Sequence, residues 1–211
     1  MFTNVLETVD IDFQPFSRLV ALEDFTLLSL SIPIGVQVRR VTRNISAFGS
    51  LCFLRRLEVR DSHLPEQVLI EAILAMRNLQ ELRLLNCSGI TQLVLECMRG
   101  LHHLHQLCLA NNGALRLEGL QEQPSVTWLD LSGNIVSLAA LEAVVQMSTL
   151  RHLVLPGAHC RVFHINSEVR HVYGSVCTVD LEWFRNNRQD VIIELCPCGL
   201  EANVAPYGKR V

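Results

Sequence analysis

The stretch Leu54-Arg-Arg-Leu57-Glu-Val59-Arg-Asp-Ser62-His-Leu64 decides the fold of this 211-residue chain. It fits the pattern L-x-x-L-x-L-x-x-N-x-L, with Ser62 where asparagine is usual. Apolar residues at its first, fourth and sixth positions are typical of a short strand and turn that direct one row of side chains inward. One such unit cannot bury that row alone, so the pattern predicts stacked copies.

The same frame recurs four more times. First positions at residues 54, 79, 104, 126 and 150 are separated by 25, 25, 22 and 24 residues. The ninth position is Asn112 in the third clear copy and Asn134 in the fourth. We expect these amides to satisfy backbone groups in the turns, with Cys87 and Ser62 doing so more weakly. The later copies are Leu79, Leu82, Leu84 and Cys87; Leu104, Leu107, Leu109 and Asn112; Val126, Leu129, Leu131 and Asn134; and Leu150, Leu153, Leu155 and Ala158.

Weaker copies flank these five, and terminal repeats are expected to be atypical. Pro33 and Phe184 occupy their asparagine positions. The boundaries that follow are an N-terminal cap over residues 1–24, a repeat domain over 25–195 and a C-terminal tail or cap over 196–211. The apolar positions of the weaker copies are Phe25, Leu28 and Leu30 before the clear repeats, and Val176, Val179 and Leu181 after them.

Segments between the expected strands carry the 3.6-residue period of amphipathic helices. The period is clear over Glu66–Arg77, Thr91–Arg99 and Leu138–Met147. The shorter link Leu117–Gln123 leaves room for only a turn or two.

These iterated copies resemble the leucine-rich repeat family over about residues 25–195. The resemblance implies an α/β solenoid with a concave parallel β-sheet and a mainly helical convex side. Residues 79–91 read L-x-x-L-x-L-x-x-C-S-G-I-T, which looks like the cysteine-containing subtype common in substrate-recognition subunits of F-box ubiquitin ligases. Residues 1–24 are too short for an F-box-like helical segment.

Positions 3, 5 and 7 of each copy are expected to face solvent from the concave sheet. Neighbouring strands lie about 4.8 Å apart, which places Arg56 beside Glu81 and Glu58 beside Arg83. Such a charged ladder is either a solvated surface network or a polar docking patch.

Trp128 occupies one of these exposed positions, flanked by Gln106, His152 and Asp130. Tryptophan is enriched among binding hot spots, although a neighbouring segment covering it would make it core. Acidic residues in the C-terminal half of the face favour a basic peptide or protein partner. The candidate partner-binding residues are Arg56, Glu58, Glu81, Arg83, Gln106, Trp128, Asp130, His152 and Asp180, with Glu182 adding to the acidic character.

Composition and charge indicate which classes of partner are not expected and in which cellular compartment the protein lies. The net charge is -3, with 18 basic and 21 acidic residues, so the basic stripe of nucleic-acid-binding proteins is not expected. The longest uncharged apolar stretch, residues 25–38, contains Pro33 and is too short for a membrane span. The first ten residues include Glu7 and Asp10 and do not have the pattern of a signal peptide, so none is expected, and we interpret the eight cysteines as mostly reduced. We therefore expect an intracellular protein, cytoplasmic or nuclear, that binds no membrane.

No sequence signature of catalysis appears, so we expect neither an enzyme nor a small-molecule substrate or cofactor. His102, His103 and His105 crowd one repeat entrance, but only two of them could share a strand face. Histidines and cysteines between His159 and Cys198 do not have the spacing of a zinc finger, so no metal site is expected.

Function is expected to be non-catalytic: an interaction module that docks a protein partner on the concave sheet. The alternatives are a substrate receptor in a ubiquitin ligase and a structural subunit of a large intracellular assembly. Lys209 is the only lysine, against 17 arginines. This scarcity reflects either the codon composition of the source genome or the avoidance of lysine in a ubiquitin-transfer machine.

Overall fold

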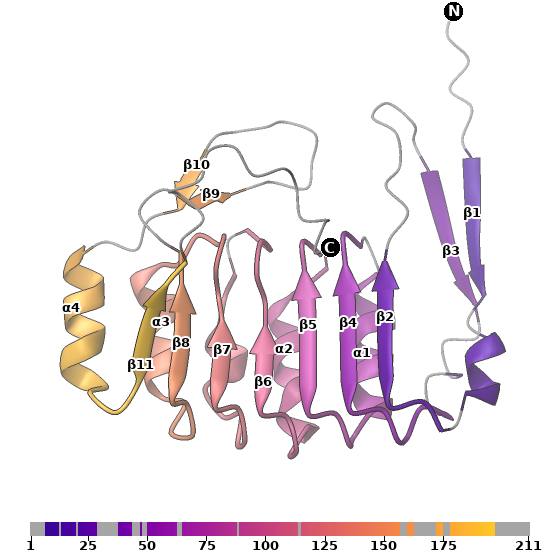
Figure 1. The fold of residues 1–211 in the computed structure, drawn as a ribbon. Helices are drawn as coiled ribbons and strands as arrows, with labels where there is room; N and C mark the ends of the chain where they lie inside the picture. The colour runs from indigo at the N-terminus through magenta and orange to yellow at the C-terminus, as the bar shows by residue number, and fades with distance from the viewer. Residues whose placement is uncertain are drawn as a thin grey trace, which may run out of the picture.

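The computed structural model describes residues 7–12, 14–19, 21–28, 38–43, 47, 50–62, 65–87, 89–113, 115–156, 160–162, 172–174 and 178–196. Its main element is a seven-stranded parallel sheet with the strand order β11-β8-β7-β6-β5-β4-β2 (Figure 1). The fold is therefore α/β. The strands are β2 (Asp24–Leu28), β4 (Arg56–Arg60), β5 (Glu81–Leu85), β6 (Gln106–Cys108), β7 (Trp128–Asp130), β8 (His152–Leu155) and β11 (Ile192–Leu195).

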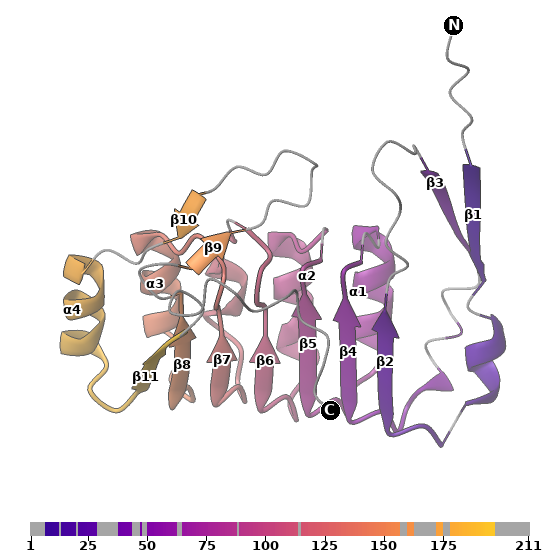
Figure 2. The ribbon, with the colours of Figure 1, turned by 45° about the horizontal axis from the view of Figure 1, so that its top comes forward.

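Helices connect successive strands and lie on one side of the sheet. Figures 1 and 2 both show α1 (Glu66–Ala75), α2 (Gln92–Cys97) and α3 (Leu138–Val145) on this side. All three fall within the segments in which the sequence predicts helices. The short link contains only the 3-10 turn η4 (Glu118–Leu120), as expected from its length, and a second turn, η3 (Met98–Gly100), extends α2.

Two of these helices begin at residues that suit a helix start. The hydroxyl of Thr91 accepts the backbone N–H of Val94 at 3.4 Å, and the hydroxyl of Ser137 accepts that of Ala140 at 3.2 Å. Each hydroxyl satisfies one of the N–H groups that the first helical turn leaves without a partner.

The leucine columns form the core between the sheet and the helices. Leu82, Leu107 and Leu129 lie at equivalent positions in β5, β6 and β7, and all three are fully buried. First-position residues such as Leu104 and Leu150 are buried as well. The predicted inward register of the central repeats is thus confirmed.

Side chains at the ninth position satisfy backbone groups in the turns, as predicted, and they also link neighbouring repeats. The amide nitrogen of Asn112 donates to the carbonyls of Leu84 and Leu109, and its oxygen accepts the N–H of Cys87 at 2.7 Å. Asn134 repeats this arrangement one step along, because its oxygen accepts the N–H of Asn112 at 2.7 Å. The Cys87 thiol donates the longer, weaker bonds expected of sulfur, 3.4 Å to Val59 and 3.3 Å to Leu85.

The register of the first repeat differs from the prediction. Phe25, not Leu28, pairs with Leu57, so the apolar frame begins three residues earlier than expected. Leu22 and Phe25 are half-buried and pack against the core. Both frames satisfy the apolar spacing in the sequence, and pairing with β4 is what selects the earlier one.

The last repeat also differs. Residues 178–187, which were expected to include a strand, form α4 (Thr178–Asn187), and the seventh strand is β11. Asp180 therefore lies in a helix, and so does Glu182, which means that neither belongs to the sheet. Leu181 and Phe184 instead pack their side chains into the end of the core.

Other described segments lie outside the main sheet. The strands β1 (Glu7–Asp12) and β3 (Val38–Arg43) pair in parallel with each other, and η1 (Gln14–Arg18) follows β1. A second pair, β9 (Cys160–Val162) and β10 (Val172–Gly174), is antiparallel. The ninth position of the fifth clear copy, Ala158, lies outside the described residues, as do most of the residues of the predicted C-terminal tail, 197–211.

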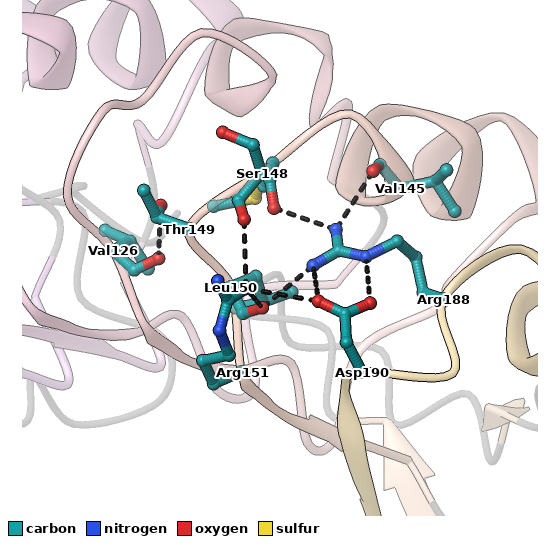
Figure 3. Close-up of polar contacts among 9 residues, drawn as sticks. Val126, Val145, Ser148, Thr149, Leu150, Arg151, Arg188 and Asp190 are labelled. Carbon is teal, nitrogen blue, oxygen red and sulfur yellow. Dashed lines mark hydrogen bonds and ion pairs between the residues drawn. The ribbon is translucent and has the colours of Figure 1, made fainter.

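A buried arginine joins the end of the sheet to α3 (Figure 3). Arg188 follows α4 and uses its guanidinium to donate to the carbonyls of Val145, Met147 and Leu150 at 2.8–3.0 Å. Its Nε and Nη2 also donate to the two carboxylate oxygens of Asp190, at 2.8 and 3.0 Å. The hydrogen bond from Arg188 lowers the pKa of Asp190 to about 2. Arg188 thus satisfies carbonyls at the end of α3 and holds the chain just before β11.

Candidate functional site

The sheet face opposite the helices is the candidate site, and we call it the open face. Its side chains alternate along each strand with the buried leucines. Strand pairing aligns these side chains into two rows that cross the sheet. From β2 to β11, the first row is Asp24, Arg56, Glu81, Gln106, Trp128, His152 and Ile192, and the second is Thr26, Glu58, Arg83, Cys108, Asp130, Val154 and Glu194.

Strands β4 and β5 carry a charged cluster at one end of the open face. The sequence predicts Arg56 beside Glu81 and Glu58 beside Arg83, and the strand register confirms both pairs. Arg56 Nε donates to Glu81 Oε2 at 2.7 Å, which raises the pKa of Arg56. Arg83 Nη1 lies 4.0 Å from Glu58 Oε2. The predicted ladder is therefore present.

Additional contacts within this cluster run along the strands. Arg83 Nε donates to the second oxygen of Glu81, and Arg60 Nε donates to Glu58. Both glutamate side chains are only 13% exposed, whereas those of Arg60 and Arg83 are 36% and 39% exposed. The carboxylates thus lie beneath the guanidinium groups. Arg60 occupies a seventh position, and the sequence reasoning left it out of the candidate set.

The side chains in the middle of the open face are more buried than expected. Cys108 and Ala110 occupy positions predicted to be exposed, but both are buried. Cys108 lies between Arg83 and Asp130 in the register, and its thiol donates to Asp130 Oδ2 at 3.4 Å. Burial, followed by the charge of Asp130, raises the pKa of Cys108 to about 12. Asp130 also accepts the N–H of Ser132 at 2.8 Å, so its carboxylate is engaged locally.

An aromatic and apolar group occupies the other end. Trp128 is half-buried, with its ring centroid 6.3 Å from that of His152 at an interplanar angle of 48°. Next in the same row, Ile192 is 63% exposed. His152 Nε2 lies 3.2 Å from Glu194 Oε1, within ion-pair distance but without the geometry of a hydrogen bond.

Eight of the nine candidate residues lie on the open face, and Asp180 does not. The sequence reasoning missed Ile192 and Glu194, which β11 contributes. The run Val191-Ile-Ile-Glu-Leu195 has the β-branched character of a strand and could have revealed them. The acidic C-terminal half expected from Asp130, Asp180 and Glu182 reduces on the sheet to Asp130 and Glu194.

Thiols and histidines outside the open face form no described metal centre. His102 and His103 are exposed in a turn and His105 just before β6, and within the described ranges no three His, Cys, Asp or Glu side chains could hold a metal ion together. His159 lies outside those ranges. The thiols of Cys52, Cys87, Cys97 and Cys108 are free, whereas Cys196 is disulfide-bonded and is an exception to the expectation that the cysteines are mostly reduced.

None of the helices in the described part of the chain combines the length and the apolar character that crossing a bilayer requires. Comparison of the chain with protein-family models and with curated proteins finds no match.

Proposed function

We propose that the chain is a leucine-rich-repeat solenoid that acts as a non-catalytic interaction module, docking a protein partner on its open face. The observation that carries this proposal is the composition of that face. The half-buried Trp128 and the exposed Ile192 lie on the same face as an arginine-rich cluster, and tryptophan and arginine are residue types that are enriched in binding hot spots.

The arrangement of layers supports the same choice of surface. The helices α1, α2 and α3 pack against the leucine side of the sheet (Figure 2). The polar and aromatic rows lie on the other side, which these helices do not cover. Repeat proteins commonly bind through the extended surface that stacked strands create.

Site-specific photo-crosslinking in the native cell tests the proposal. A photo-reactive amino acid replaces Gln106 on the open face or, as a matched control, Gln67, which is exposed on α1. We expect protein adducts from position 106 that Trp128→Ala weakens, and none of these adducts from position 67. Adducts that form only from position 67, or that Trp128→Ala leaves unchanged, would contradict docking on the open face.

The identity of the adduct separates this function from the two alternatives. A ligase scaffold would indicate a substrate receptor, and several subunits of one large complex would indicate a structural role. An intracellular location is also part of the proposal. The free thiols of Cys52 and Cys97 support it, the disulfide at Cys196 argues against it, and imaging of the tagged chain decides.

A further inference from the structure

We infer that the open face binds an extended acidic segment of its partner, with carboxylates on Arg60 and Arg83 and an apolar side chain on Trp128 and Ile192. This inference rests on the proposed function and specifies the chemistry of the partner. It departs from the basic partner that the sequence favours, because Asp180 and Glu182 belong to a helix and not to the sheet.

The arginines of the cluster are held in place for such a ligand. Each of Arg60 and Arg83 donates through Nε to a glutamate, which restricts the plane of its guanidinium. Within the described part of the chain, the Nε atoms of Arg60 and Arg83 donate the hydrogen bonds of these side chains, and the Nη atoms of Arg60 and Nη2 of Arg83 donate none to a carboxylate. Pre-ordered Nη groups are suited to carboxylates, which arginine binds through two parallel hydrogen bonds.

The exposed charge of this cluster is positive. Arg56, Arg60 and Arg83 are 36–56% exposed, whereas Glu58 and Glu81 are 13% exposed. A partner that approaches the cluster therefore meets guanidinium groups before carboxylates. Asp24 lies 3.8 Å from Arg56 Nε at the edge of the face, so we leave Arg56 out of the predicted contacts.

The other end of the face carries one engaged carboxylate and one exposed carboxylate. Asp130 already accepts hydrogen bonds from Ser132 and Cys108, whereas the Glu194 side chain, beside His152, is 60% exposed. The apolar Ile192 is 63% exposed and neighbours His152, whose ring lies beside that of Trp128. The arginines at one end of the open face and these apolar and aromatic side chains at the other favour a segment with an acidic end and an apolar end.

Strand spacing sets the distance between those two ends. Arg83 on β5 and Trp128 on β7 are two strands apart, or about 10 Å at roughly 4.8 Å per strand. Arg60 on β4 is three strands from β7, or about 14 Å. An extended chain covers about 3.3 Å per residue, so the acidic residue lies about three or four positions from the apolar one.

Selection from a displayed random-peptide library on the full chain tests this inference. We expect enrichment of peptides with Asp or Glu three or four positions from an aromatic or aliphatic residue. For an enriched peptide, replacing its acidic residues with the corresponding amides is expected to weaken binding to the unaltered protein by about tenfold, measured by fluorescence polarisation.

Protein variants provide the second arm. The double substitution Arg60→Gln with Arg83→Gln is expected to weaken binding about as much, whereas Arg99→Gln with Arg185→Gln, at exposed arginines outside the open face, is expected to leave it unchanged. Far-UV circular dichroism checks folding. If the first double variant unfolds, the amide peptide on the unaltered protein decides the result.

Several outcomes would overturn the inference. These are enrichment of basic or uncharged peptides, no enrichment at all, full binding of the amide peptide, or binding of a single-stranded RNA oligonucleotide in place of peptides. Crosslinking from position 106 tells the two proposals apart. Protein adducts together with any of these outcomes reject only the acidic segment, whereas the loss of those adducts rejects docking itself.

Discussion

Arg188 provides the sharpest test of how the end of the sheet is held together. We predict that Arg188→Met destabilises the fold strongly, although methionine retains much of the length and apolar surface of the arginine stem. The reason is that Arg188 is buried and directs its guanidinium to three backbone carbonyls and to Asp190 (Figure 3). Methionine has no donor for any of them.

The magnitude follows from which carbonyls would retain a donor. Met147 O keeps the N–H of Leu150 at 3.1 Å, and Leu150 O keeps Arg151 Nη1 at 2.8 Å. Val145 O would lose its bond from Arg188 at 3.0 Å. The three lost hydrogen bonds, one of which leaves the part-buried carbonyl of Val145 without a donor, together give about 2 to 4 kcal/mol of lost unfolding free energy. The contact with Asp190 is left out of this sum because solvent screens that half-exposed carboxylate.

Urea unfolding followed by far-UV circular dichroism measures this loss. At the slopes usual for proteins, a loss of this size lowers the midpoint by about 1 M or more. Trp183 in α4 is half-buried against the core, so its fluorescence reports on the same end of the sheet. The slope is expected to stay unchanged if only stability is affected.

A matched control is available three residues earlier. Arg185 lies in α4 and is exposed, so Arg185→Met should shift the midpoint little. Arg188→Lys should be intermediate, since an ammonium has three donors where the guanidinium has five. Equal midpoints for Arg188→Met and Arg185→Met would refute the role assigned to the buried guanidinium.

Further predictions concern pH, backbone and thiols. Because the pKa of Asp190 is lowered from 3.8 to about 2, its stabilising effect is complete above about pH 4 and is lost as pH falls toward 2. In Asp190→Asn, the unfolding midpoint should therefore change less with pH across that window. The same pH dependence in the variant and the unaltered protein would count against the pairing of Asp190 with Arg188. Gly133→Ala should lower the midpoint clearly, because the residue has φ +67° and an added Cβ would lie 1.8 Å from Asn111 Oδ1; an unchanged midpoint would contradict this packing. At pH 8, the exposed Cys52 should react with a thiol reagent in the folded protein. Cys108 is buried and its pKa is raised to about 12, so it should react only after unfolding. Rapid labelling of Cys108 in the folded protein would contradict its burial.

Repeat spacing by itself determined the central part of this protein. Each clear copy contacts mainly its neighbours, so the same apolar positions recur from β4 to β8 and point inward together. The pairing of Arg56 with Glu81 and the placement of Trp128 beside His152 followed from that period, as did the hydrogen bonds of Asn112 and Asn134 to backbone groups of the turns. Local pattern sufficed because every such interaction joins equivalent positions of adjacent copies.

The strand register at the two ends of the sheet and the burial of side chains on the open face could be known only from the three-dimensional structure. At the first repeat, two apolar frames fit the sequence equally well, and pairing with β4 selected the one that puts Phe25 in register with the core. At the last repeat, β11 and not the predicted strand pairs with β8, which puts Ile193 in register with the core. Burial of Cys108 and Arg188 depends on side chains and carbonyls contributed by other segments. A repeat pattern predicts which residues occupy equivalent positions in adjacent strands, whereas the burial of a residue depends on every segment that surrounds it in space.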